Sequence, residues 1–167
     1  YGGIGSQVAK LGKAFGMRVT GIRRNPQDDE HADEVLGLDR FEELLPLTDY
    51  LVLSLPDSPQ TRDIINADIL EKLSNSAMII NVGRGTAINE EDLSDALNGE
   101  KIAAAALDTT KVEPLDASSS LWTAKNCFIS AHDSAHSLLS LERAFELFFQ
   151  NIKNIKNGDQ IVNLYSE

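Results

Sequence analysis

Three ionisable residues follow three successive apolar runs of the sequence, and together they could act on an anionic carbonyl compound. Arg84 stands between two glycines directly after AMIINV, and His132 comes just after CFIS. Between them, IAAAAL is followed by Asp108 and then by Glu113, which precedes a proline. An arginine can bind a carboxylate through two parallel hydrogen bonds, and a histidine can give or take one proton near neutral pH. The set indicates a site that holds an anionic carbonyl substrate and shuttles one proton.

Each of these residues also has an ordinary structural explanation when it is taken alone. Arg84 could form a surface salt bridge, Glu113 could be a loop charge, and His132 could be a loop histidine with satisfied hydrogen bonds. Taken one at a time, these explanations are favoured, so the functional interpretation depends on the ordered set. His136 lies close behind His132 and is the reserve candidate for the acid/base residue.

These residues can meet only if neighbouring strands bring their carboxyl ends to one edge of a sheet. Apolar runs of strand length alternate with helical patterns, which predicts an α/β fold with a Rossmann-type doubly wound parallel sheet. Such sheets bind ligands beyond the carboxyl ends of their strands. The expected strands are 17–22, 50–55, 77–82, 102–107 and 127–130, the expected helices 4–15, 41–45, 68–73 and 90–97, and the expected loops 25–33 and 111–120.

One long helix is expected after the last strand. It carries an apolar stripe with the spacing of a helix face, and Gly158 is a plausible stop after it. The stripe is expected to pack into the core. Its members are Leu141, Phe145, Phe148, Ile152 and Ile155.

The chain opens on the glycine-rich turn YGGIGSQVAK, which leads into a helix. Gly2 and Gly5 fit the second and third glycines of the G-x-G-x-x-G dinucleotide fingerprint, and the N–H groups of the helix could hold phosphates. The first glycine and the first strand of the sheet would then lie before Tyr1, so we expect an N-terminally truncated domain. An ordinary strand-to-helix turn is the alternative explanation.

The residues that follow the strand MRVTGI favour NADP as the cofactor. Dinucleotide sites specific for NAD carry an acidic residue at this position, which binds the ribose hydroxyl groups. Here Arg23 and Arg24 stand there instead, and no carboxylate occurs until Asp28. Two guanidinium groups suit a 2′-phosphate, although an arginine pair could also be a solvated edge, and NAD stays possible.

The amino-acid composition disfavours some classes of binding partner. The 167 residues are 42% hydrophobic, which suits one globular domain, and 26 Asp and Glu against 15 Lys and Arg give a net charge of −11. An anionic chain disfavours nucleic acid and anionic membranes as partners. Cys127 is the single cysteine and lies in an apolar run, so a buried thiol and a cytoplasmic location are expected. No leader, membrane span or metal ligand set is expected.

The motifs in order resemble those of the D-isomer-specific 2-hydroxyacid dehydrogenases, and the resemblance runs from Tyr1 to about Leu164. RRNP resembles the NADP-preferring glyoxylate/hydroxypyruvate reductase branch. The motifs are LPDSPQTRDIINADILEKLSNSAMIINVGRGTAINEEDLSDALNGEKIAAAALD, then EPL, then LW and NCFISAH.

The resemblance implies roles for particular residues. Arg84 would bind the carboxylate and carbonyl oxygen of a small 2-keto acid, His132 would be the acid/base, and Glu113 would orient it. The residues implied to bind the cofactor are Gly2, Gly3, Ile4, Gly5, Arg23, Arg24, Pro56, Thr61, Val82, Gly83, Arg84 and Asp108, with Gly3 and Ile4 at the pyrophosphate and Asp108 on the nicotinamide carboxamide.

The same resemblance has consequences for the whole molecule. Residues 1–167 would be the dinucleotide-binding domain with a C-terminal helix and tail, and the substrate domain would lie outside this chain, so the isolated fragment is expected to be inactive. Family members are usually homodimers. A dinucleotide-sensing corepressor and a degenerate homologue are the alternatives, because Ala131 and Asp133 around His132, and TTKV before Glu113, depart from the family pattern.

Overall fold

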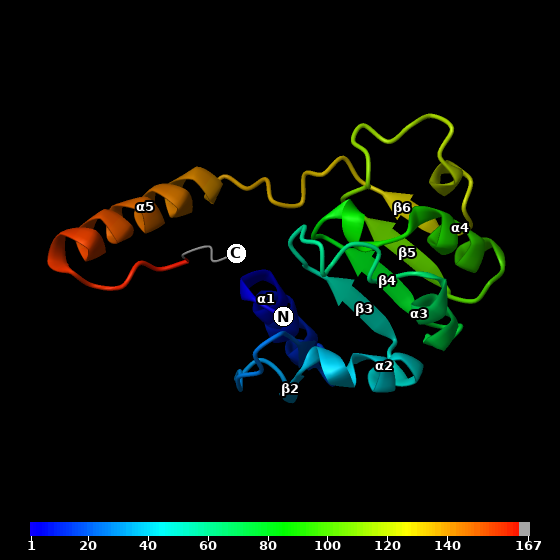
Figure 1. The fold of residues 1–167 in the computed structure, drawn as a ribbon, viewed down its shortest axis with the longest axis horizontal. Helices are drawn as coiled ribbons and strands as arrows, with labels where there is room; N and C mark the ends of the chain where they lie inside the picture. The colour runs from blue at the N-terminus through cyan, green and yellow to red at the C-terminus, as the bar shows by residue number, and fades with distance from the viewer. Residues whose placement is uncertain (164–167) are drawn as a thin grey trace. The chain divides into compact units, whose positions relative to one another are not determined.

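The computed structural model describes residues 1–163, and the chain divides into two compact units, Tyr1–His132 and Asp133–Glu167. Figure 1 shows the elements of each. The first unit contains all of the strands and helices α1 to α4. The strands are β1 (Thr20–Ile22), β2 (Glu34–Leu36), β3 (Tyr50–Leu53), β4 (Met78–Asn81), β5 (Ala104–Leu107) and β6 (Cys127–Ile129), and the helices are α1 (Gly3–Ala14), α2 (Phe41–Leu44), α3 (Ala67–Lys72), α4 (Glu90–Asn98) and, in the second unit, α5 (Ser140–Asn157).

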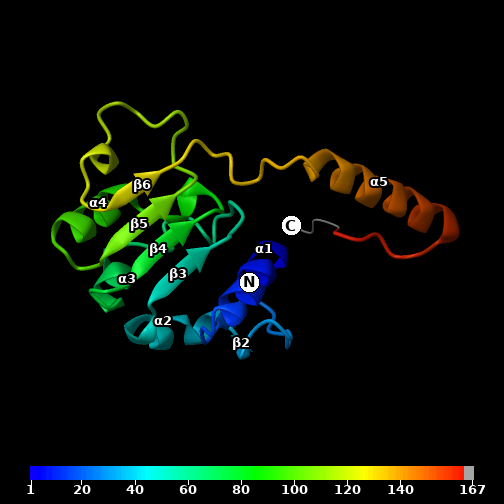
Figure 2. The ribbon, with the colours of Figure 1, turned by 180° about the vertical axis from the view of Figure 1, so that it is seen from behind.

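All strand pairs of the first unit are parallel. Strands β3, β4, β5 and β6 form a four-stranded sheet in that order, which Figure 2 shows side by side. The register places Leu53 opposite Asn81, Asn81 opposite Leu107, and Leu107 opposite Ile129. Since these residues end their strands, the four segments that follow leave from one edge of the sheet. The predicted α/β class and parallel pairing are confirmed.

The strands divide between two sheets, because β1 pairs with β2 and not with β3. In the described part of the chain no strand pairs with both β1 and β3, which is where the sequence predicted a missing strand at the centre of the sheet. Strand β2 was not expected from the sequence. Its three residues follow directly on an acidic segment, and so short a run carries little periodicity of its own.

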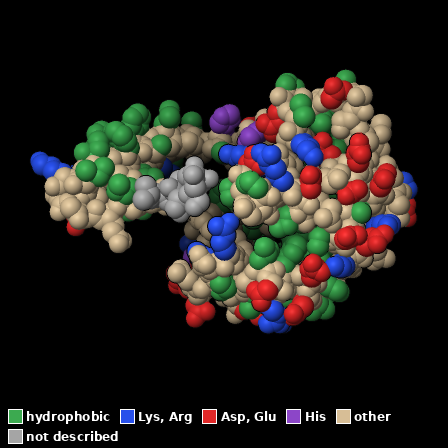
Figure 3. Space-filling view, viewed as in Figure 1, with side chains coloured by type: hydrophobic (Ala, Val, Ile, Leu, Met, Phe, Trp, Pro, Cys, Tyr) green, Lys and Arg blue, Asp and Glu red, His purple; other side chains and the backbone are tan. Residues whose placement is uncertain are grey.

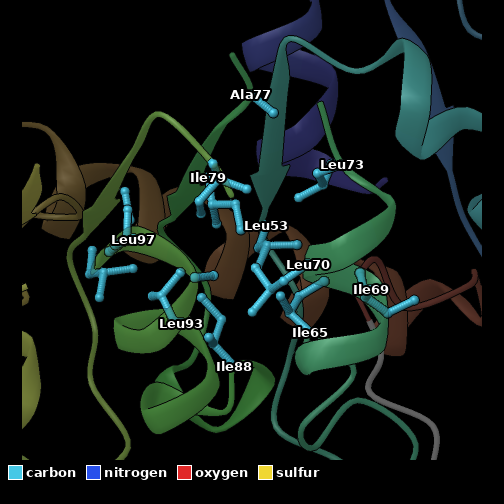
Figure 4. Packing of buried hydrophobic residues seen from close by; sticks show 14 of the residues in the cluster. Leu53, Ile65, Ile69, Leu70, Leu73, Ala77, Ile79, Ile88, Leu93 and Leu97 are labelled. Carbon is cyan, nitrogen blue, oxygen red and sulfur yellow. The ribbon is translucent and has the colours of Figure 1, made fainter. Parts of the chain in front are cut away.

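Helices α3 and α4 cover one face of the four-stranded sheet, and Figure 4 shows how their apolar side chains meet those of the strands. Leu70 and Leu93 from the helices and Ile79 from β4 are at most 1% exposed. Asn66 and Asn89 begin the two helices, because each side chain accepts a hydrogen bond from a backbone N–H of the first turn. This packing fixes the strands whose ends carry the candidate site.

The second unit contains α5, which ends at Gly158 in the left-handed conformation with φ 78°. That stop was predicted, but the core packing of the stripe was not found. Figure 3 shows hydrophobic side chains gathered along this helix. Residues 133–163 contain no second helix or sheet against which to bury them. The exposed members are Leu141, Phe145, Phe148, Ile152 and Ile155, together with Phe149.

Candidate active site and dinucleotide site

The three predicted catalytic residues line one pocket at the carboxyl edge of the four-stranded sheet. Its volume is about 200 Å³. Arg84 reaches it from the segment after β4, Glu113 from the segment after β5, and His132 from the segment after β6. The remaining lining residues are Asp57, Gly85, Thr86, Thr109, Thr110 and Lys111. The structure therefore brings together residues that the sequence only placed in order.

His132 and Glu113 form the central contact of this pocket. Nδ1 of the imidazole lies 2.8 Å from Oε2 of the carboxylate, and Oε1 accepts a hydrogen bond from the backbone N–H of Thr110 at 3.1 Å. The hydrogen bond with His132 is the main reason that the pKa of Glu113 lies below its ordinary value. An ionised carboxylate at Nδ1 holds the proton on that nitrogen, which leaves Nε2 for chemistry. His132 adopts φ 56°, a conformation that is uncommon outside glycine.

The glycines around Arg84 are explained by close backbone approaches. A Cβ at Gly85 would lie 2.0 Å from the carbonyl carbon of Thr110, and one at Gly83 would lie 2.6 Å from the backbone nitrogen of Leu55. Asn81 is 1% exposed and holds the turn by donating to the carbonyl of Arg84 at 3.1 Å and accepting from the N–H of Gly83 at 3.0 Å. Arg84 itself is exposed, and Nη1 of its guanidinium donates to the carbonyl of Gly83 at 2.9 Å.

Asp108 lies at the end of β5 but is not among the residues that line the pocket. It is 6% exposed, and its Oδ1 accepts a hydrogen bond from Oγ of Ser130 at 2.7 Å. Its backbone N–H donates to the carbonyl of Asn81. These contacts join the carboxyl ends of three neighbouring strands. The role in cofactor binding that the resemblance implies for Asp108 stays a prediction.

The glycine-rich opening forms the first turn of α1. A Cβ at Gly2 or Gly3 would have no heavy atom within 4 Å, and no side chain caps the helix. A ligand can therefore approach the backbone closely, and the first N–H groups, among them that of Ile4, are free to hold an anion. Gly5 is more closely surrounded, since a Cβ added to it would lie 3.5 Å from Oγ of Ser54. This arrangement fits a pyrophosphate.

The arginine pair follows β1 directly, where the backbone N–H of Arg23 donates to the carbonyl of Leu36 at 3.0 Å. Within residues 1–163 neither Arg23 nor Arg24 forms an ion pair through its guanidinium. The nearby acids have other partners. Asp29 accepts from Oγ of Ser6 at 2.9 Å, and Asp33 pairs with Lys13. Both arginines can therefore receive an anionic group.

The remaining predicted residues lie in the segments that follow β3 and β4. Thr61 donates from Oγ1 to the carbonyl of Pro56 at 2.7 Å, so these two residues shape the turn after β3. The backbone N–H of Val82 donates to the carbonyl of Leu53 at 3.0 Å. Cofactor contacts of Pro56, Thr61 and Val82 stay predictions. The reserve candidate His136 belongs to the second unit and does not line the pocket.

Sequence reasoning missed five side chains that line the pocket: Asp57, Thr86, Thr109, Thr110 and Lys111. A signal for Asp57 was present, because it follows β3 and so leaves the same edge of the sheet as the other three segments. The described residues contain no group of acids, histidines or cysteines suited to a metal ion. No helix in that part of the chain is long and apolar enough to cross a membrane.

Comparison with known proteins identifies the family. Residues 1–134 match the family model described as "D-isomer specific 2-hydroxyacid dehydrogenase, NAD binding domain". The chain is 34% identical over 163 residues to a hydroxypyruvate reductase of Blautia hydrogenotrophica, which covers 96% of this chain and 50% of the relative. It is 37% identical over 132 residues to the human glyoxylate reductase/hydroxypyruvate reductase, which covers 78% of this chain and 40% of the relative.

Solved structures give the same result. A D-isomer specific 2-hydroxyacid dehydrogenase family protein from Aeromonas salmonicida superposes with a TM-score of 0.86 at 34% identity, covering 98% of this chain and 52% of that one. An NADPH-dependent glyoxylate/hydroxypyruvate reductase from Sinorhizobium meliloti, in complex with NADP and sulfate, superposes with a TM-score of 0.86 at 28% identity and the same coverage. The chain thus spans about half the length of the relatives that it matches.

Proposed function

The chain belongs to the D-isomer specific 2-hydroxyacid dehydrogenase family, and we propose that it is the dinucleotide-binding part of an enzyme that reduces small 2-keto acids with NAD(P)H. The observation that carries this proposal is the pair of His132 and Glu113 in one pocket with Arg84. The substrate domain is proposed to lie in the part of the relatives' length that this chain does not span.

The residues of the pocket can perform the acid/base half of this reaction. Arg84 holds the substrate carboxylate by paired hydrogen bonds. His132, charged at Nε2, donates its proton to the oxygen of the carbonyl as that oxygen becomes an alkoxide. Glu113 stabilises the charged imidazole and fixes its orientation from Nδ1. The bound nicotinamide cofactor supplies or accepts the hydride.

NADP is the proposed cofactor, with NAD as a possible substitute. The open backbone at Gly2 and Gly3 suits a pyrophosphate. The guanidinium groups of Arg23 and Arg24, which form no ion pair with the described residues, suit the 2′-phosphate that distinguishes NADP. The Sinorhizobium meliloti neighbour, whose structure contains NADP, is consistent with this preference.

We also propose that the protein is a homodimer and that it is located in the cytoplasm. Both features rest on the resemblance to the family, and the cytoplasmic location also rests on the single cysteine. Burial raises the pKa of the Cys127 thiol to about 11, so this group is protonated at neutral pH and behaves as a small apolar side chain.

The decisive test is His132→Ala in the full polypeptide that carries this chain. We expect reduction of glyoxylate and hydroxypyruvate to fall by about 10²-fold or more, while the affinity for NADPH stays the same. A protein that acts instead as a dinucleotide sensor would show no turnover before the substitution and would keep its partner interaction after it.

A second test asks whether residues 1–167 bind the cofactor but need the proposed substrate domain for turnover. Residues 1–167 alone should bind NADPH but reduce glyoxylate poorly, because only one wall of the substrate site is present to orient substrate and exclude water. Turnover by residues 1–167 comparable with that of the full polypeptide would refute the proposal that a second domain completes the site.

A further inference from the structure

Asp57 places a carboxylate in the wall of the same pocket, on the segment that follows β3. Its Oδ1 accepts hydrogen bonds from Nε of Arg62 and from Oγ1 of Thr86, each at 3.0 Å, and its Oδ2 accepts one from Nη2 of Arg62 at 3.1 Å. Thr86 comes two residues after Arg84. The carboxylate is therefore held at a fixed place beside the residue proposed to bind substrate.

This carboxylate keeps capacity for one more hydrogen bond. An ionised carboxylate offers about four acceptor positions, and the three hydrogen bonds with Arg62 and Thr86 leave one on Oδ2. The side chain remains 39% exposed while it lines the pocket. The same partners, with Arg62 first, keep the pKa of Asp57 below its ordinary value, so the group is anionic at neutral pH.

The other charged side chains that line the pocket each have an ion-pair partner or a proposed role in binding substrate. Arg84 is proposed to bind the substrate's own carboxylate, and Glu113 is paired with His132. Nζ of Lys111 lies 3.2 Å from Oδ1 of Asp63, and Asp57 is itself paired with Arg62. Each charge in this chain's wall of the pocket is therefore paired or has a proposed role, and what remains for a further group of the substrate is the open acceptor position on the Asp57 carboxylate.

We propose that Asp57 is a specificity-determining residue that selects 2-keto monocarboxylates with an uncharged hydrogen-bond donor next to the carbonyl, such as a 3-hydroxyl group, over dicarboxylates and phosphorylated analogues. This inference rests on the proposed function and names its substrate class. A donor on the substrate completes the acceptor set of Oδ2, whereas a second carboxylate or phosphate brings no donor to this position and would place its oxygens against those of the Asp57 carboxylate.

Three probe substrates separate these effects in the full polypeptide. Hydroxypyruvate and pyruvate differ only by the hydroxyl group, while oxaloacetate adds a carboxylate to the pyruvate frame. We expect kcat/KM for hydroxypyruvate to exceed that for pyruvate by about tenfold or more, the scale of one hydrogen bond to a charged group, and oxaloacetate to be the poorest of the three.

Asp57→Asn removes the charge and keeps the shape. We expect the hydroxypyruvate to pyruvate ratio of kcat/KM to fall by about tenfold, and the oxaloacetate to pyruvate ratio to rise by about the same factor. Because ratios are compared within one variant, a general loss of activity cancels. Unchanged ratios in Asp57→Asn, or a wild-type preference for oxaloacetate or 3-phosphohydroxypyruvate, would overturn the proposal.

Two control variants separate charge from loop integrity. Arg62→Gln breaks the same ion pair but keeps the carboxylate, so the discrimination between the probes should persist; equal loss in both variants would refute a direct role for Asp57. Asp68→Asn alters an exposed acid of α3 and should leave all three kcat/KM values unchanged. If the wild-type polypeptide reduces neither glyoxylate nor hydroxypyruvate, the proposed function itself fails and this inference falls with it.

Discussion

Glu113 and His132 leave the ends of two neighbouring parallel strands and meet with 2.8 Å between Oε2 and Nδ1. This contact decides which nitrogen of the imidazole faces substrate. Glu113→Gln keeps the shape but loses the charge, so we expect kcat for 2-keto acid reduction to fall by about 10²- to 10⁴-fold. Steady-state kinetics with a parallel NADPH titration measures this, and an unchanged kcat would contradict the assigned role.

The same pair makes stability depend on pH. The pKa of Glu113 is lowered in the folded chain, first by the hydrogen bond with His132, so its stabilising effect is present above the unfolded pKa and is lost as pH falls through the folded one. Below a pH of about 4.5, the ordinary value for Glu, the free energy of unfolding should therefore fall less steeply in Glu113→Gln than in the wild type. Urea unfolding between pH 3 and 7 tests this, with Glu91→Gln as an exposed control; parallel pH profiles would contradict it.

The same substitution at two glycines should affect stability at one and cofactor affinity at the other. Gly85→Ala forces a methyl group against the backbone of Thr110, so we expect it to cost about 1–3 kcal/mol in the free energy of unfolding and to displace Arg84. Gly3→Ala meets nothing within 4 Å, so stability should change by at most about 0.5 kcal/mol, while NADPH affinity falls because backbone approach is blocked. Urea unfolding and NADPH titration of both variants test this, and equal destabilisation would contradict it.

The arginine pair should set the choice between the two cofactors. Arg23→Ala together with Arg24→Ala removes both donors to a 2′-phosphate, so we expect NADPH affinity to fall by about 10- to 100-fold and NADH affinity to change little. Fluorescence titration at two salt concentrations measures this, because the arginine contribution should weaken as salt rises. An equal loss for both cofactors would show that the pair acts on the common part of the dinucleotide.

The sequence shows the glycines on either side of Arg84 but not the reason for them. A Cβ at Gly83 or Gly85 would meet the backbone of Leu55 or Thr110, and only the structure brings these segments together. Asp57 was missed because a lone aspartate in a loop carries no periodicity, and its place after an expected strand was the only signal that it would lie at the same edge of the sheet.

Other differences arise from tertiary structure. The stripe on α5 has the pattern of a buried face, yet Phe145 and Phe148 are 59% and 56% exposed, because periodicity shows which residues share a face and not what covers it. Strand β2 was missed since three residues make too short a run to recognise without the partner strand β1 that pairs with them.

Two adjacent threonines beside the pocket provide a matched test of buried polar groups. Thr109 is 3% exposed, and its Oγ1 has no hydrogen-bond partner among the residues described. Thr110 is 9% exposed, and its Oγ1 donates to the carbonyl of Val112 at 2.9 Å. A buried hydroxyl without a partner is destabilising, whereas a paired one is roughly neutral or favourable.

Valine has nearly the shape of threonine without the hydroxyl, so the two substitutions should differ in sign. Thr109→Val should raise the free energy of unfolding by about 1 kcal/mol, and Thr110→Val should lower it by about the same amount, since it leaves the carbonyl of Val112 unpaired. Urea unfolding of both variants under one condition measures the difference. If Thr109→Val destabilised the chain as much as Thr110→Val, the hydroxyl of Thr109 would have to be hydrogen-bonded in solution, for example to a buried water molecule.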